Sequence, residues 1–264
     1  MIVVDNNSTD GTASLARSYG VRVVEELDVG VCAARQRGAE VAAGEIMVST
    51  DADTVHPASW LRSIDANFSD SSVIAVAGPC RFENAEGWIK GYPGLLFSLV
   101  AQVFAMTGFV FYVSATNLAM RRTAFPGYDT KQTQGGDELD VLRRIRRRGV
   151  VLWDRNNVVT TSPRRLQRGF LYNFFVTFLT YYLMAYALNR LPGRRKLGMA
   201  PVVRTPLFPR NAGAGPLASG FRPPHRRLRL AHAINGEFRA LDLADSGPGH
   251  RLEAATMSLE AHSR

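Results

Sequence analysis

The sequence predicts an α/β fold in which a mostly parallel, Rossmann-like sheet is flanked by helices. Three short apolar runs support this prediction, at residues 2–4, 21–24 and 45–50. A polar turn and a helix-forming stretch separate the first run from the second. The resulting order of strand, loop, helix and strand is typical of parallel sheets.

The loop after the first predicted strand is a dense cluster of turn-forming residues, at positions 5–12. Ser8 or Asp10 can cap the helix that follows, and Gly20 ends that helix. Ligands of parallel sheets bind beyond the carboxyl ends of the strands, so the Asp5 carboxylate is a candidate acceptor for a base or ribose donor. The alternative is that Asp5 only closes a local turn.

A pair of acids, Asp51 and Asp53, ends the third predicted strand. Alternate residues of an extended chain point to the same side, so these carboxylates can present hard oxygen ligands together. Mg²⁺ or Mn²⁺ holding a diphosphate takes one or two carboxylates plus phosphate oxygens. The other interpretation is a solvated turn, because two acids one residue apart are a weak motif by themselves.

These motifs and later ones resemble the inverting nucleotide-sugar glycosyltransferases of family 2, which have the GT-A fold. The resemblance covers roughly residues 2–165, well over half of the chain. The order and spacing agree across the matching stretches, which are Val3–Thr12, Gly30 with Ala34–Gly38, Ser49–Asp53, Thr116–Arg122, and Gly135–Asp140 followed by Arg143–Gly149.

The resemblance implies a hexosyltransferase-type enzyme that moves a sugar from a UDP- or GDP-type nucleotide sugar to an acceptor, with inversion. It implies Mn²⁺ or Mg²⁺ as the cofactor, held by Asp51 and Asp53. It also places Asp5 at the nucleoside, Arg35 near the diphosphate and Asp51 near the ribose. The full set of nucleotide-sugar-binding residues that it implies is Asp5, Asn7, Ser8, Asp10, Arg35 and Asp51.

The resemblance draws the catalytic base from the acidic pair Asp137-Glu138. The family writes this pair as Glu-Asp, so by position Glu138 takes the base role, and Asp137 or Asp140 could replace it. A carboxylate that takes the proton of the acceptor hydroxyl typically contributes about 10²–10⁴-fold in rate. The alternative is that these acids only favour the start of a helix whose far end carries the arginines of residues 143–148.

In the family another strand and helix precede the strand at residues 2–4. We therefore expect a chain that is truncated relative to the family, with a sheet that exposes an unpaired edge or an uncovered face. Such a chain should express poorly in soluble form. Residues 191–264 are expected to add charge but little core.

Length and composition predict one enzyme domain with an appendage. The chain has 264 residues, 46% of them hydrophobic, which is enough for one substantial core. Its net charge is +9, and residues 191–264 carry 12 Lys/Arg and 5 Asp/Glu. That stretch is rich in Pro, Gly and Arg and reads as a largely disordered tail, with one helix at 228–240. The predicted organisation is a glycosyltransferase domain at 1–168, an apolar helix at 169–190 and a basic tail at 191–264.

Two uncharged apolar segments, at residues 92–113 and 169–188, raise the question of a membrane. Pro93 and two glycines interrupt the first, which by the resemblance packs with the catalytic domain. The second is aromatic-rich with arginines on both sides, which suits an interfacial helix or a short span, although a buried helix is the alternative. With no signal peptide and only two cysteines, we expect a cytoplasmic enzyme associated with the inner face of the cell membrane.

Two other functions stay open from the sequence. A sugar-phosphate nucleotidyltransferase would show a glycine-rich phosphate loop and a basic residue after its first strand, and neither is visible. A non-enzymatic basic module would bind anionic lipid or nucleic acid through residues 143–148 and the tail. The arginine run lacks interleaved aromatics, so no specific nucleic acid is expected. The expected acceptor is a lipid, such as a polyprenyl phosphate, or a saccharide.

Overall fold

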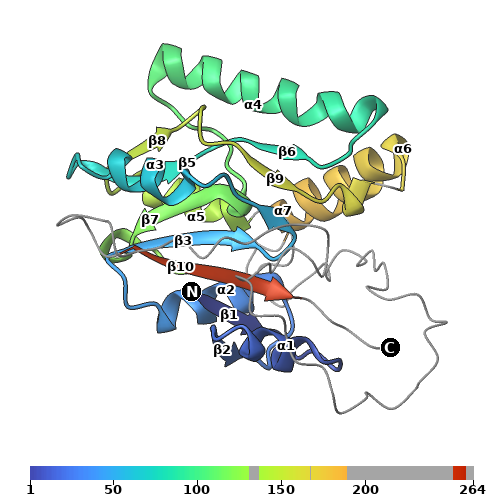
Figure 1. Ribbon diagram of the computed structural model, residues 1–264. Coiled ribbons are helices and arrows are strands. Elements are labelled where there is room, and N and C mark those ends of the chain that lie inside the picture. The colour runs from blue at the N-terminus through green and yellow to red at the C-terminus, as the bar shows by residue number, and fades with distance from the viewer. Residues whose placement is uncertain (131–136, 167, 189–251, 260–264) are drawn as a thin grey trace.

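The structure is a computed structural model, and it describes residues 1–130, 137–166, 168–188 and 252–259. Two β-sheets form its centre, with helices on both sides (Figure 1). The helix predicted at 228–240 lies outside the described residues. The larger sheet runs, from edge to edge, through β2 (Arg22–Glu25), β1 (Ile2–Asp5), β10 (Leu252–Leu259), β3 (Ile46–Asp51), β7 (Leu118–Arg121), β5 (Val73–Ala77) and β8 (Val150–Trp153).

The larger sheet is mostly parallel, which confirms the predicted fold class. Strands β2, β1, β10 and β3 are parallel neighbours, whereas β7 runs antiparallel to both β3 and β5. The apolar runs at the start of β1 and in β3 are buried on both faces, as interior parallel strands require. The predicted strands at 21–24 and 45–50 are confirmed with ends shifted by one residue.

A smaller sheet and a set of helices complete the described part of the fold. The smaller sheet has the order β4 (Thr54–Val55), β9 (Val159–Thr161) and β6 (Cys80–Phe82). The helices are α1 (Thr12–Ser18), α2 (Val31–Val41), α3 (Trp60–Asn67), α4 (Gly87–Thr107) and α5 (Asp137–Ile145), with single 3₁₀ turns η1 (Ala115–Asn117), η2 (Arg122–Ala124) and η3 (Arg164–Leu166).

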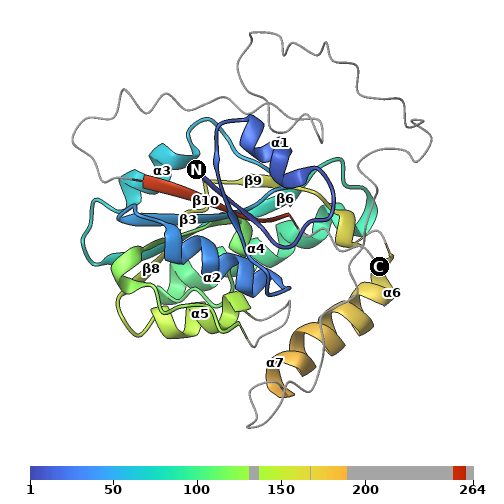
Figure 2. The same cartoon turned by 90° about the horizontal axis from the view of Figure 1, so that it is seen from below.

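Two long apolar helical segments lie at the outside of the molecule. Helix α4 packs along the smaller sheet, on the opposite side of the molecule from α1 and α2 (Figure 1). Residues 170–188 form one helix in three parts, α6 (Phe170–Tyr172), a π-helical stretch η4 (Asn173–Met184) and α7 (Ala185–Leu188). This helix projects away from the two sheets (Figure 2), so it does not cover the larger sheet.

Strand β10 corrects the expectation of an exposed sheet edge. It pairs in parallel with β1 on one side and with β3 on the other, so β1 has a neighbour along both of its edges. A segment about 200 residues after β3 thus supplies the strand that the sequence analysis found missing. Residues 252–259, which were expected to belong to a largely disordered tail, form this strand; the remainder of that tail lies outside the described residues.

Deleting residues 252–264 is expected to abolish cooperative folding. The deletion removes the strand that pairs with both β1 and β3. We expect the free energy lost with these two pairings to exceed the net stability of a domain, which is about 5–15 kcal/mol. Thermal unfolding followed by near-UV circular dichroism measures the effect, with deletion of residues 260–264 alone as the control that leaves β10 intact. A sharp, wild-type transition in the longer deletion would contradict the assignment of β10.

Candidate active site

Asp5 and Asp51 are the last residues of β1 and β3, so both lie at the carboxyl end of the parallel strands of the larger sheet. Strand β10 lies between them, so their backbones are two strand spacings, about 10 Å, apart. The Asp5 side chain is 7% exposed, and its Oδ1 has no hydrogen-bond partner among the described residues. The hydroxyl of Ser8 is buried and unpaired in the same way. Unpaired buried acceptors are rare and costly, by about 1–3 kcal/mol, unless a ligand satisfies them.

Asn6 holds the loop that carries these two groups. Its amide Nδ2 donates to the carbonyls of Glu26, at 3.0 Å, and Asp28, at 2.8 Å. Its Oδ1 accepts from the backbone N–H of Gly30 at 2.8 Å, where φ is 144° and favours glycine. Asn6 therefore ties the end of β1 to the start of α2, a supporting role that the sequence analysis did not assign.

Two other predicted nucleotide-binding residues have local roles in the same loop. Asn7 is exposed, and its backbone is left-handed with φ of 59°. Asp10 is exposed, and its Oδ1 accepts from the N–H of Thr12 at 2.9 Å, at the start of α1. Gly11 is the N-cap residue of α1 and no side chain caps the helix, so the predicted cap by Ser8 or Asp10 is wrong. Asp10 instead accepts a hydrogen bond from the first residue of the helix.

Arg35 connects the end of β3 to the start of α5. Its guanidinium donates from Nη2 to Asp51 Oδ1 at 3.0 Å and from Nη1 to Asp137 Oδ2 at 2.6 Å. The Glu138 carboxylate lies 3.5 Å from the same Nη1. Because Arg35 is only 4% exposed, these acids, far apart in sequence, are held together by one buried cation. The predicted metal-binding and base motifs therefore lie beside each other.

The two carboxylates of the acidic pair differ in their electrostatic surroundings. Burial favours the neutral form of Asp137, but the Arg35 guanidinium outweighs this and holds the pKa of that carboxyl below its usual value. Burial, and then the negative charge of Asp137, raise the pKa of Glu138 to about 8. Asp137 is 2% and Glu138 19% exposed, so Glu138 is the more accessible acid and the one poised to titrate near neutral pH. Acids also fill the first turn of α5, so the helix-start interpretation holds as well.

Each acid of the other pair is occupied by donors from the protein. Asp51 Oδ2 accepts from the hydroxyl of Thr116 at 3.0 Å, in addition to its bond from Arg35. Asp53 accepts from the Thr161 hydroxyl at 3.3 Å and pairs with the Arg164 guanidinium at 3.0 Å. From the sequence, Arg164 is only a basic residue that flanks an apolar segment, because nothing local connects it with a residue 111 positions earlier.

The donor set fits a divalent ion that also binds phosphate. Within the described ranges, no group of three or more His, Cys, Asp or Glu side chains is arranged to hold a metal. Two carboxylates are nevertheless what Mg²⁺ or Mn²⁺ requires when substrate phosphates supply the remaining ligands. Asp51 and Asp53 are 32% and 17% exposed, which leaves their oxygens within reach of a ligand once their protein partners release them.

His56 lies beside this pair in its neutral form. Its Nε2 is 2.7 Å from the Thr50 hydroxyl, and its ring lies against Trp60, tilted by 33° with centroids 3.8 Å apart. Burial lowers the pKa of His56 to about 4, so at neutral pH the imidazole adds no positive charge next to Asp51. A cation at Asp51 and Asp53 thus meets no repulsion from this histidine.

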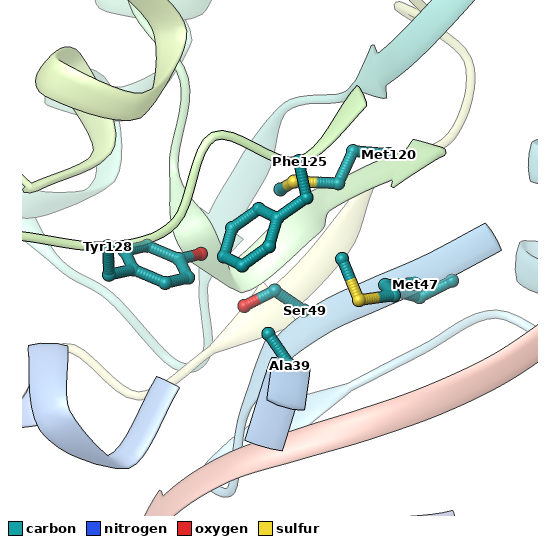
Figure 3. A pocket seen from close by; sticks show the side chains of 7 residues that line it. Ala39, Met47, Ser49, Met120, Phe125 and Tyr128 are labelled. Carbon is teal, nitrogen blue, oxygen red and sulfur yellow. The ribbon is translucent and has the colours of Figure 1, made fainter. Parts of the chain in front are cut away.

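A small cavity lies behind β3, and Tyr128 in its lining is close enough to Arg35 and Asp137 to interact with their charges. Its lining is mostly apolar and comes from α2, β3, β7 and the segment that follows β7 (Figure 3). The hydroxyls of Ser49 and Tyr128 point toward one another there (Figure 3). The cavity has room for about one water molecule, so it is a gap in the core and not a sugar site.

Comparison with known proteins identifies the amino-terminal part of the chain. Residues 1–128 match the family described as Glycosyl transferase family 2. The matched residues are just under half of the chain. The match includes β1 to β3, Arg35 and both acids of the Asp51–Asp53 pair, and it confirms the predicted glycosyltransferase ancestry and, with the observed sheet, the GT-A fold.

Individual relatives match over limited stretches. Glycosyltransferase AglE from Haloferax volcanii is 31% identical over 93 residues, which are 33% of this chain and 31% of that protein. Among solved structures, mannosyltransferase PcManGT from Pyrobaculum calidifontis, in complex with GDP-Man and Mn²⁺, is 24% identical with a TM-score of 0.48, covering 61% of this chain and 47% of that one. Mannosyl-3-phosphoglycerate synthase from Rubrobacter xylanophilus is 22% identical with a TM-score of 0.48, covering 72% and 63%. The chain thus spans about a third of the curated relative and less than two thirds of either solved chain.

Proposed function

We propose that this protein transfers a glycosyl group from a UDP- or GDP-type nucleotide sugar to an acceptor hydroxyl or lipid phosphate, with inversion at the anomeric carbon. One observation carries the proposal: Asp5 with its unpaired Oδ1, the Asp51–Asp53 pair and the accessible Glu138 lie at and beside the carboxyl ends of β1 and β3. In a family 2 domain, these groups match the needs of a nucleoside, a diphosphate and an acceptor.

The chemistry assigns one task to each group. The Asp5 carboxylate accepts a hydrogen bond from the nucleoside, and the buried Ser8 hydroxyl borders the same space. A divalent ion held by Asp51 and Asp53 would supply charge neutralisation for the departing diphosphate. Glu138 takes the proton of the acceptor hydroxyl while the hydroxyl oxygen of the acceptor forms the new bond to the anomeric carbon. The bond from that carbon to the phosphate oxygen breaks, and the electron pair leaves with the nucleoside diphosphate.

The direct test is release of UDP or GDP from a panel of nucleotide sugars in the presence of Mn²⁺ and candidate acceptors. We expect one nucleotide class to be released in an acceptor-dependent manner, and EDTA to stop the reaction. Release of pyrophosphate from a nucleoside triphosphate and a sugar phosphate, with no turnover of nucleotide sugars, would instead show a nucleotidyltransferase.

Replacing Asp5 by alanine is expected to weaken nucleotide binding about 10- to 100-fold without lowering the melting temperature. A hydrogen bond to a charged acceptor contributes about 1.5–3 kcal/mol, whereas the buried Oδ1 of Asp5 forms no hydrogen bond with the described residues that the substitution could remove. Calorimetric titration with UDP and GDP, beside thermal unfolding, measures both effects.

Asp65→Ala is the matched control for that variant. Asp65 Oδ1 is likewise buried and unpaired, but it lies on α3, which contributes none of the site groups. Equal nucleotide affinity in Asp5→Ala and the wild type would remove Asp5 from the nucleotide site.

The acceptor and the cellular location form the second half of the proposal. The exposed, aromatic-rich helix at residues 170–188 supports association with a membrane, and with it a lipid-linked acceptor. The corresponding location is the cytoplasmic face of the cell membrane. A saccharide acceptor is tested in the same panel of reactions.

A further inference from the structure

Helix α4 presents an apolar face to the solvent. Its inner face packs on the core through Pro93, Phe97 and Val100. A surface helix normally carries charges on the opposite face, yet residues 91–107 contain none. The outer face instead holds large apolar side chains at helical spacing, with the exposed fraction in parentheses: Tyr92 (44%), Leu95 (76%), Leu99 (50%) and Met106 (82%).

A second apolar element continues this face. The exposed apolar side chains of residues 170–188 include Phe170, Leu171 and Phe175. The Phe170 ring meets Trp88 of α4 edge to face, with centroids 5.4 Å apart. The outer face of α4 and the helix at 170–188 therefore meet at one corner, and we call these two together the apolar surface.

Cationic side chains stand at both ends of the α4 part of this surface. Lys90, at one end, is exposed, and Arg168 is exposed next to the corner formed with Phe170. At the other end, the Arg146 guanidinium lies 4.3 Å from the ring centroid of Phe109, which is itself 47% exposed, and Arg147 beside it is exposed. Aromatic and aliphatic groups flanked by Lys and Arg are the composition that binds the interface of an anionic bilayer.

We propose that the apolar surface docks on an anionic lipid bilayer, with α4 lying in the plane of the interface. Among the described residues, α4 is the one helix long and apolar enough to cross a membrane. It does not cross in this arrangement, because its inner face belongs to the core and contacts β6. The inference deepens the membrane association proposed above, and it does not rest on glycosyl transfer.

Flotation of the full chain with vesicles tests the docking surface. We expect binding to vesicles of phosphatidylcholine and phosphatidylserine, and much weaker binding to phosphatidylcholine alone. The triple variant Leu95→Glu, Leu99→Glu, Met106→Glu should lose at least about tenfold in partitioning, because three apolar side chains no longer leave water and three negative charges face anionic lipid. These positions are exposed, so the melting temperature should stay near that of the wild type.

The matched control places the same three charges on exposed apolar residues elsewhere, as Leu15→Glu, Leu27→Glu, Val150→Glu. Wild-type partitioning in the control and loss in the α4 variant supports the proposal. Equal binding by the two variants overturns it. The proposal is also overturned if the wild type is a dimer that does not bind vesicles and the α4 variant is a monomer. In that case a second copy of the chain covers the surface. Failure of lipid binding with nucleotide release intact leaves glycosyl transfer standing, so the two proposals fail separately.

Discussion

Glu138→Gln is expected to cut turnover by about 10² or more while donor affinity stays near the wild-type value. The amide keeps the size of the side chain but cannot take a proton, and proton removal is needed only for transfer. Nucleotide release under saturating donor measures turnover, and calorimetric titration with the nucleotide measures affinity. Similar losses in both quantities would instead assign Glu138 to donor binding.

The pH dependence of the wild type provides a second signature. Glu138 must be ionised to act as a base, and its pKa in the free protein is raised to about 8 by burial and by Asp137. The value of kcat/KM should therefore rise with pH up to about 8 and fall roughly tenfold per unit below it. The acidic limb should disappear from the residual activity of Glu138→Gln. A flat profile in the wild type would contradict the assignment of this base.

Asp137→Asn separates the two neighbouring acids. Asp137 is the closest partner of the buried Arg35, so its loss is expected to destabilise the fold by about 3–5 kcal/mol. The same change removes a negative charge next to Glu138, and the acidic limb should shift to lower pH. If Asp137→Asn instead loses all turnover at wild-type stability, the base role belongs to Asp137.

Asp53→Ala is expected to abolish Mn²⁺-dependent nucleotide binding and to leave the fold intact. Asp53 follows β3 in a turn, outside the core, so the substitution removes a ligand and no packing. Binding of Mn²⁺ with and without UDP or GDP, followed by electron paramagnetic resonance of the free ion, measures the loss directly. Unchanged Mn²⁺-dependent affinity in the variant, with EDTA also without effect, would exclude the metal site.

Arg164→Gln is the companion variant, with the opposite expected sign. The Arg164 guanidinium occupies Asp53 at 3.0 Å, so it competes with a metal ion for the same oxygen. Removing this charge should tighten Mn²⁺ binding about tenfold, the equivalent of about 1.4 kcal/mol. The carboxylate ligands stay the same, so the gain comes only from the loss of the competing cation. Arg62→Gln, on α3, removes a surface charge elsewhere and serves as the control. Equal Mn²⁺ affinity in all three proteins would show that Arg164 does not compete.

Local sequence patterns were enough to predict the strands that carry the site. The apolar runs before Asp5 and Asp51 are short, continuous and followed by turn residues, so they predict interior strands whose ends bear acids. The acids at the start of α5 were predicted in the same way, from charges at the two ends of one segment. These features depend on neighbours in the chain, which is why the sequence reveals them.

The features that were missed join residues distant in the chain. Residues 252–259 lack a run of β-branched or aromatic residues, and only pairing with β1 and β3 places them in the sheet. The bond from Arg164 to Asp53 closes a loop of 111 residues. Arg35 was expected near the diphosphate, and its hydrogen bonds to Asp51 and Asp137 join α2 to the end of β3 and to the start of α5. None of these three long-range pairings has a signature in the residues that surround each partner.

The central position of β10 sets when the larger sheet can close during synthesis of the chain. About 200 residues are synthesised after β3 before the strand that joins it to β1 emerges. During that interval β1 with β2, and β3 with β7, exist only as separate halves whose facing edges are unpaired. Sheet closure is therefore a late, non-local step, which is expected to slow folding. The candidate nucleotide site, which lies at the carboxyl ends of β1 and β3, forms only when that step is complete.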